Sequence, residues 1–513
     1  MVLVVISNTR GTLHALGVLS ALSEIWSTDN KSHLGSHSTL IHILNNDSLL
    51  NMFFFCRPVI LDESEASNMQ ILQGGNWNRE RWWYRLVQVC RRWRYLVLDS
   101  ASYLRLSLVC TRGTSVADML AHSPSLPLVI DYLDGHYITA EEEKGITLAL
   151  QHHDRVCRIR LRNSILKLQR LVNALDGEFP ILEYLYIDHH STIEYIANLT
   201  FPKTFRTPHL RHFLLMNSAI PTETTLLSNT GNLVTLSLNL IPPSAYFHPN
   251  ALLQRVLLMS QLEILWITSN DYYSSSDVER QLLHRPIMTR VTLPNLRWLG
   301  FRGANAYLEG LLPWVAIPLL EKIQVYFINQ LTYSIPHLQQ SMITGNLRLK
   351  AATLTFREDH FHVSAFPHKG ARMSTLDVEL SGIHLDWQVA SAAQLFRTLS
   401  TVFSAVEDLY FNYDRRLISS EWNDEADRTQ WRELLGSFNN VKTILMSSAG
   451  GHSMIEQLSR ALQPDEGESP MALLPELQEL AYFPPFAFPN ALIPFIEARQ
   501  KTAHPLTVTA VRF

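Results

Sequence analysis

LEILWI (262–267) and LRWLGF (296–301) follow one six-residue pattern: apolar, two residues of any kind, apolar, one of any kind, apolar. Ten further copies occur along the chain, with starts 22 to 36 residues apart. They are VCRIRL (156–161), LEYLYI (182–187), LRHFLL (210–215), LVTLSL (233–238), LEKIQV (320–325), AATLTF (351–356), MSTLDV (373–378), VEDLYF (406–411), VKTILM (441–446) and LQELAY (477–482). An internal repeat at this spacing is typical of leucine-rich arrays with insertions.

The repeats predict a solenoid, because a short strand with a return helix buries its apolar edge only by stacking on the next unit. Several copies follow a proline, as in Pro294-Asn295-Leu296, which marks the entry to a strand. Helices are expected between copies, at 251–259, 387–403 and 421–438. The fold class is therefore α/β, with a short helical region followed by one curved leucine-rich-repeat-like solenoid with a parallel sheet over 101–513. A chance match in a leucine-rich chain is the alternative.

The repeats also predict an outward-facing set of side chains. In a strand that alternates faces, positions one, four and six turn inward, while positions three and five and the next residue face out. Aromatic residues and arginine dominate this outward set, as they do in protein–protein hot spots. We expect these residues to bind a protein substrate: Tyr184, Tyr186, Trp266, Trp298, Arg302, Tyr326, Arg357 and Tyr410. The alternative is that other segments cover them.

Two helices are expected before the repeats. The apolar run that ends at Phe55 predicts a short helix over 40–55, opened by Asp and Ser capping candidates. A second helix, over 82–100, has an apolar stripe and a basic back. Two such helices make too little core to stand alone, so we expect them to pack against a partner. Residues 1–38 have no sustained period and form a poorly specified extension, which leaves domains at 39–100 and 101–513.

Composition excludes several classes of protein. The 513 residues include 43 Lys and Arg against 47 Asp and Glu, a net charge of -4, which argues against nucleic acid as a partner. The four cysteines show no pairing typical of zinc or of a secreted scaffold, which favours a reducing, intracellular compartment. No stretch is apolar enough for a signal peptide or a membrane span. No nucleotide-binding, protease or hydrolase motif occurs, so we expect no enzyme, no cofactor and no metal.

The segment from Leu86 to Val97, LVQVCRRWRYLV, resembles the second half of the F-box, whose pattern is Leu-x-x-Val-Cys-[Lys/Arg]-x-Trp-[Arg/Lys]-x-[Leu/Ile]. The segment from Leu44 to Phe53 resembles the first half of the F-box, with Asn45 at the position where the family has proline. The continuation, including Leu104-Arg105-Leu106 and Ala121-His122-Ser123-Pro124, is similar to the large F-box families of mushroom-forming fungi, which run on into degenerate leucine-rich repeats.

This resemblance implies a substrate-recognition subunit of a Skp-cullin-F-box ubiquitin ligase, which does no bond chemistry itself. The F-box would dock on a Skp-family adaptor, and through it on a cullin, while the repeats capture a protein substrate in the cytoplasm, the nucleus or both. The expected adaptor contacts are the apolar stripes of both helices: Leu49, Leu50, Met52, Phe53, Leu86, Val89, Cys90, Trp93 and Leu96. The alternative is an interaction scaffold whose F-box has decayed and that belongs to no ligase.

Overall fold

The computed structural model describes residues 44–57, 81–133, 138–189, 199–218, 225–228, 231–241, 247–269, 289–328, 334–345, 347–382, 384–414, 427–447, 452–465, 467–482, 490–502 and 505–511. The expected extension at 1–38 lies outside these residues. The chain divides into two compact units, Met1–Tyr132 with Thr139–Arg158, and Leu133–Ile138 with Ile159–Phe513. In this division the first part of the expected solenoid belongs with the helices. The domains expected at 39–100 and 101–513 stay a prediction.

The described part of unit 1 opens with four short helices. The first has its N-terminus capped by Asn45, whose Oδ1 accepts a hydrogen bond of 2.8 Å from the backbone N–H of Ser48. The single helix expected over 82–100 is two helices, because Cys90 is extended (φ -157°, ψ 170°) and interrupts it. The four helices are α2 Asn46–Cys56, α4 Trp82–Val89, α5 Arg91–Asp99 and α6 Ala101–Leu104.

The rest of unit 1 alternates strands and helices. Its strands β1 and β2 pair in parallel, with Leu108 opposite Leu128. Helix α8 starts with a capping box, in which Thr139 and Glu142 each bond the other's backbone N–H. The elements are β1 Leu108–Cys110, α7 Val116–His122, β2 Leu128–Tyr132, α8 Ala140–Leu150 and β3 Val156–Asn163, the last of which continues into unit 2.

Unit 2 contains one large, mostly parallel sheet with strands in the order β4-β5-β6-β7-β9-β11-β14-β13-β12-β15-β16-β17-β18. A separate pair joins β8 (Val291–Thr292) and β10 (Val315–Ala316). The strands of the large sheet are β4 Tyr184–His189, β5 His212–Met216, β6 Thr235–Ile241, β7 Ile264–Ser269, β9 Trp298–Gly303, β11 Lys322–Phe327, β12 Ala351–Arg357, β13 His360–Phe366, β14 Leu376–Ser381, β15 Asp408–Asp414, β16 Thr443–Ser447, β17 Glu479–Tyr482 and β18 Thr507–Ala510.

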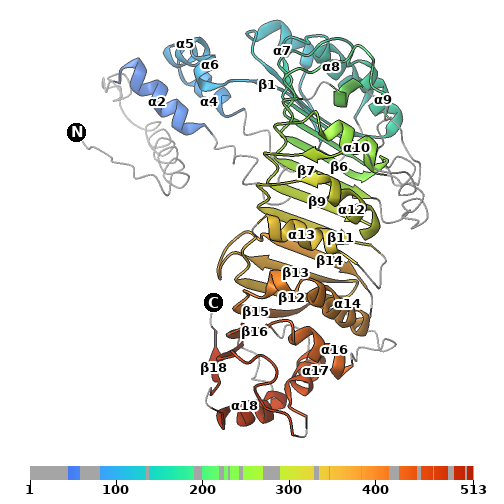
Figure 1. Ribbon diagram of the computed structural model, residues 1–513. Helices are drawn as coiled ribbons and strands as arrows, with labels where there is room; N and C mark the ends of the chain where they lie inside the picture. Colours follow the sequence, from blue (N-terminus) through green and yellow to red (C-terminus); the bar gives the residue numbers. More distant parts are fainter. Residues whose placement is uncertain are drawn as a thin grey trace, which may run out of the picture. The chain divides into compact units, whose positions relative to one another are not determined.

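Helices follow the strands along one side of this ladder (Figure 1). Each helix turns an apolar stripe to the sheet; α14, for example, buries Leu385, Val389, Ala392 and Phe396. The expected return helices at 251–259 and 387–403 are confirmed as α10 and as α14 with α15, and the described part of the third is α16. The helices of unit 2 are α9 Ile165–Asn173, η4 Thr225–Ser228, α10 Pro249–Val256, α12 Asn305–Leu311, η7 Leu312–Trp314, α13 Pro336–Thr344, α14 Leu385–Thr398, α15 Ser400–Phe403, α16 Arg428–Leu435, α17 His452–Leu462, η8 Asn490–Leu492 and α18 Ile493–Gln500.

A repeated backbone contact joins successive copies of the pattern. The carbonyl of the second pattern residue accepts hydrogen bonds from two backbone N–H groups of the next copy, so Glu263 O bonds both Arg297 N and Trp298 N at 2.9 and 3.0 Å. Asparagines just before the pattern add a second link: Asn232 Nδ2 donates to Pro208 O and Asn295 Nδ2 to Ser260 O, both at 2.9 Å. The sequence repeat is therefore a structural repeat, and the α/β solenoid with a parallel sheet is confirmed.

The sheet departs from a simple parallel array at one place. Strand β13 pairs antiparallel with both β12 and β14, so the chain order 11-12-13-14-15 becomes 11-14-13-12-15 in space. β12 therefore pairs in parallel with β15, and β14 pairs with β11. The copies at 351–356 and 373–378 are consequently separated by β13 rather than adjacent. The strand at 360–366 was not predicted, although its burial alternates strictly.

Candidate protein-binding surfaces

The helices of unit 1 use part of their apolar stripes to pack on one another. The rings of Phe53 on α2 and Trp93 on α5 meet edge to face with centroids 4.7 Å apart. Arg92 also joins the two helices, because its Nη2 donates to Leu44 O at 2.5 Å and to Asn46 Oδ1 at 2.9 Å. These contacts hold α5 against α2 at the N-terminus and in the C-terminal half of α2.

The nine residues expected to contact the adaptor accordingly divide by exposure. Four are buried within unit 1: Leu49, Phe53, Leu86 and Trp93. Four are half-buried, Leu50, Met52, Cys90 and Leu96, and Val89 is 41% exposed. The buried four hold the helices together, which leaves the other five as surface on which a partner can pack. Their role in binding an adaptor stays a prediction.

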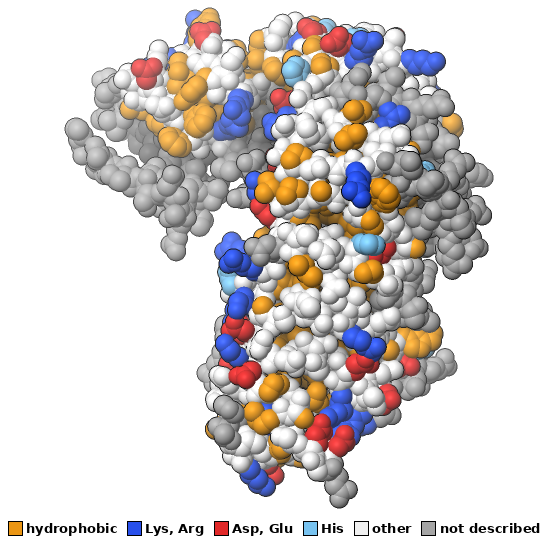
Figure 2. Space-filling view, in the orientation of Figure 1, with side chains coloured by type: hydrophobic (Ala, Val, Ile, Leu, Met, Phe, Trp, Pro, Cys, Tyr) orange, Lys and Arg blue, Asp and Glu red, His pale blue; other side chains and the backbone are white. Residues whose placement is uncertain are grey.

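Sequence reasoning missed a more exposed group on α2 and α6. Phe54 is 40%, Phe55 76% and Tyr103 50% exposed, and the rings of Phe54 and Tyr103 lie 5.4 Å apart. We call these three residues the aromatic patch. Hydrophobic side chains gather on the surface over this part of unit 1 (Figure 2). Large contiguous apolar patches on a protein surface mark interaction sites. Phe55 ends the apolar run of its helix, which is the signal that could have found it.

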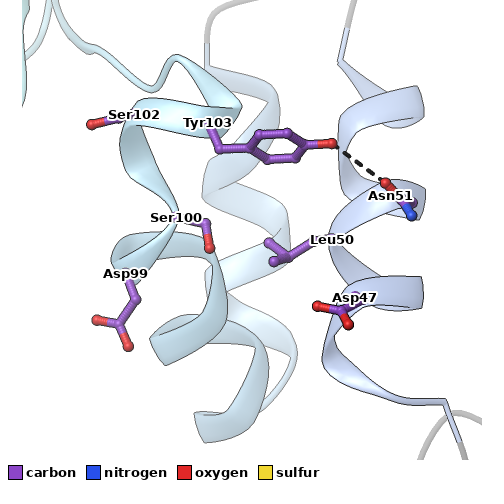
Figure 3. A pocket seen from close by; sticks show the side chains of 7 residues that line it. All are labelled: Asp47, Leu50, Asn51, Asp99, Ser100, Ser102 and Tyr103. Atoms are coloured by element: carbon purple, nitrogen blue, oxygen red, sulfur yellow. Dashed lines mark hydrogen bonds between the residues drawn. The ribbon is translucent and has the colours of Figure 1, made fainter.

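A cavity of about 480 Å³ lies beside the aromatic patch, between α2 and the end of α5 (Figure 3). Leu50 points into it, and Tyr103 reaches across to donate a hydrogen bond of 3.3 Å to Asn51 Oδ1. The cavity is lined by Asp47, Leu50, Asn51, Asp99, Ser100, Ser102 and Tyr103. It combines one apolar side chain with polar groups at its edge, which suits a side chain presented by another protein.

In unit 2 the residues opposite the leucine core form what we call the outer face of the sheet. Alternation places the predicted substrate residues there, but burial contradicts the exposure expected for half of them. Tyr184, Tyr186, Trp266 and Trp298 are 2%, 0%, 6% and 6% exposed. Arg302, Tyr326 and Tyr410 are half-buried, and Arg357 is exposed.

The two tryptophans are buried because side chains on the outer face pack sideways on their neighbours. Trp266 lies over Gly300, where an added Cβ would stand 1.8 Å from the indole ring. Its ring meets that of Trp298 edge to face at 5.6 Å, and Tyr326 lies 6.3 Å away. The ammonium of Lys322 lies 4.6 Å from the centre of the Trp298 ring. These rings are structural, which corrects the expectation that they form an exposed patch.

The two tyrosines are buried for a similar reason. The hydroxyl of Tyr186 bonds Asp188 Oδ2 at 3.3 Å and Met216 Sδ at 2.8 Å, and Arg162 Nε donates to the same Asp188 oxygen at 2.6 Å. Tyr184 lies beside His212 on the neighbouring strand, with ring centroids 6.0 Å apart. Alternation along a strand indicates a face of the sheet, whereas the neighbouring strands decide whether that face is covered.

Asp377 is the centre of a polar network on the outer face. Its carboxylate accepts hydrogen bonds from Gln324 Nε2 at 2.9 Å and from Ser364 Oγ at 2.7 Å, and it lies 3.5 Å from His362 Nε2. Burial raises the pKa of this carboxyl, but the hydrogen bonds from His362, Ser374 and Ser364 more than offset that effect. The pKa of Asp377 is therefore lowered from its ordinary value of 3.8.

We expect Asp377→Asn to lower the free energy of unfolding at pH 7 by about 1–3 kcal/mol, because buried donors lose a charged acceptor. A carboxyl with a lowered pKa stabilises the fold above its unfolded pKa and loses that contribution as the pH falls through its folded pKa. The difference in free energy of unfolding between wild type and variant should therefore become smaller below about pH 4. Urea unfolding at several pH values measures it, with the exposed Asp154→Asn as control. A difference in free energy of unfolding that does not change with pH would contradict the stabilising role of the charged Asp377 carboxylate.

Among the described residues, no group of three or more His, Cys, Asp or Glu side chains could hold a metal ion. No helix within the described ranges is both long and apolar enough to cross a membrane.

Comparison with known proteins gives matches to solved structures alone. No protein-family model matches the chain, and no curated protein matches it. The chain is similar to the leucine-rich repeat-containing protein LegL7 from Legionella pneumophila, with 11% identity, 77% of this chain and 97% of that chain covered, and a TM-score of 0.26. It is also similar to the structure of the Rad7 and Elc1 complex in yeast, with 12% identity, 98% of each chain covered and a TM-score of 0.27. These TM-scores are too low to bear on function.

Proposed function

We propose that this protein is the substrate-recognition subunit of a Skp-cullin-F-box ubiquitin ligase of the type found in mushroom-forming fungi. The observation that carries the proposal is the aromatic patch, which stands exposed on the helices whose sequence resembles the F-box. The residue most accessible on it, Phe55, is 76% exposed beside a cavity lined by Leu50. In this role the protein binds a Skp-family adaptor, and through it a cullin, and catalyses no reaction itself.

The repeats would capture the protein substrate, in the cytoplasm, the nucleus or both. With four of the predicted contacts buried, this task falls to the accessible members of the outer face. Arg357 ends β12, and Tyr410 stands on the adjacent strand β15, opposite Thr353 of β12. Arg302 and Tyr326 pair across β9 and β11. All four are arginine or tyrosine side chains, which are common in binding hot spots.

Binding of a recombinant Skp adaptor to the full chain tests the proposal. We expect wild type to bind and Phe55→Glu to bind at least about tenfold more weakly, because a charge in an apolar contact loses its hydration without a partner. Leu166→Glu is the matched control, since Leu166 is 77% exposed on α9 of unit 2. It should bind as wild type does.

The second candidate function is an interaction scaffold with a decayed F-box. The chain departs from the family pattern at Asn45, which caps α2 where the family has proline. Absence of adaptor binding by the folded wild-type chain would refute the ligase proposal in favour of the scaffold. Equal loss of binding in Phe55→Glu and Leu166→Glu would show that the aromatic patch is not the contact.

A further inference from the structure

A second cleft in unit 1 has a different chemistry from the cavity beside the aromatic patch. It measures about 420 Å³ and lies among α4, α5, β1 and α7, and we call it the α4–α7 cleft. It shares no residue with the first cavity or with the nine expected adaptor contacts. Its size lies in the range of pockets that bind small ligands or one to two side chains.

The apolar part of the α4–α7 cleft comes from three elements. Val87 on α4, Leu98 on α5 and Met119 on α7 line it, and all three side chains are half-buried. Half-burial leaves apolar surface that a ligand can cover, and the removal of this surface from water favours binding. An apolar side chain therefore fits here.

The charge at the cleft is of one sign. Arg81 and Arg94 line it, and no Asp or Glu within the described part of the chain does. Arg81 Nη2 donates to Val109 O at 3.1 Å and to Thr114 Oγ1 at 2.9 Å, which holds its guanidinium in place at the cleft. The positive charge of Arg81 attracts an acidic ligand without a further hydrogen bond.

Arg94 is held at the cleft by its own backbone neighbourhood. Its Nε donates to Val87 O at 3.0 Å, which fixes the side chain across the gap between α4 and α5. No described residue accepts a hydrogen bond from its two Nη atoms. The guanidinium is therefore already held in position, with both Nη groups available to donate hydrogen bonds. This arrangement suits a carboxylate.

From this combination we infer that the α4–α7 cleft binds an acidic peptide segment of a partner protein. An apolar side chain of the peptide covers Val87, Leu98 and Met119, and a neighbouring Glu or Asp carboxylate accepts hydrogen bonds from Arg94, with the charge of Arg81 close by. The site does not depend on adaptor binding by the helices. It adds a third surface to the aromatic patch and the outer face.

Calorimetric titration of the full chain with three short peptides tests this inference. The acidic peptide acetyl-Glu-Leu-Glu-amide should bind with a Kd of about 1 mM or tighter. Acetyl-Gln-Leu-Gln-amide lacks the carboxylates and acetyl-Glu-Ala-Glu-amide lacks most of the apolar side chain, so each should bind at least about tenfold more weakly. Equal binding of all three, or no binding of the first at about 10 mM, would overturn the inference.

Variants place the binding in the cleft. Arg94→Gln should weaken binding of the acidic peptide about tenfold, because it removes one forked, charge-assisted contact. Arg91→Gln is the matched control, since Arg91 is exposed on the same helix and does not line the cleft. It should bind as wild type does. An equal effect of the two substitutions would mean that the peptide responds to net charge rather than to this site.

Discussion

Gly300→Ala is expected to lower the free energy of unfolding by about 3 kcal/mol, near the upper end of the cost of overpacking. The Cβ of an alanine would stand 1.8 Å from Cε3 of Trp266, closer than any non-bonded contact, so the indole ring has to move. The ring cannot move freely, because it packs against Trp298 and Tyr326. Denaturant unfolding followed by tryptophan fluorescence measures the loss.

The control for this variant is Gly231→Ala. The nearest atom to a Cβ at Gly231 is Leu258 O at 3.8 Å, an ordinary contact, so its effect should stay within about 0.5 kcal/mol. A double variant with Trp266→Ala isolates the clash, because removal of the ring should recover most of the cost of Gly300→Ala. Additive effects of the two substitutions would show that the ring does not lie over Gly300.

Trp93→Ala is expected to cost about 3–5 kcal/mol, the range for truncating a large buried aromatic side chain. Trp93 is 7% exposed and supports Phe53, so its removal leaves a void between α5 and α2. Its indole N–H has no hydrogen-bond partner among the residues that the structure describes, and the expected loss is therefore one of packing. If the proposed function holds, adaptor binding falls with the loss of the helix pair.

Thermal unfolding compares this variant with Tyr95→Ala on the same helix. Tyr95 is 67% exposed, so its truncation should change stability little. Similar unfolding of the two variants would contradict the packing of α2 on α5. Loss of adaptor binding in Tyr95→Ala at unchanged stability would instead place Tyr95 in the contact.

The repeat pattern predicted the sheet because the inward positions serve the same purpose in every copy. Leu262, Leu265 and Ile267 are all buried, as the spacing requires. The alternation of inward and outward positions along a strand did not predict whether neighbouring side chains cover the outer face of the sheet. The burial of Trp266 depends on a glycine in the next strand, 34 residues further along, and on the register that places the two together.

The sequence patterns did not predict two further features of the backbone, each for a local reason. The helix expected over 82–100 breaks at Cys90, which has an apolar position on the wheel but an extended backbone. The antiparallel strand β13 interrupts the parallel series with a segment that contains no copy of the pattern. In the helical region, the apolar stripe predicted that Leu49 and Phe53 are buried. It did not predict that Phe55 is exposed, because this depends on where the helix ends.

The inverted order of β12, β13 and β14 affects how the chain acquires its structure. A simple solenoid extends by one neighbour at a time, each new unit docking on the one made before it. Here β11 ends at Phe327, but its next partner in the sheet is β14, which ends at Ser381. During synthesis the growing array must therefore stop at β11 until the whole three-strand segment has emerged. Pairing of β14 with β11 closes a long loop, which makes it the natural slow step of folding.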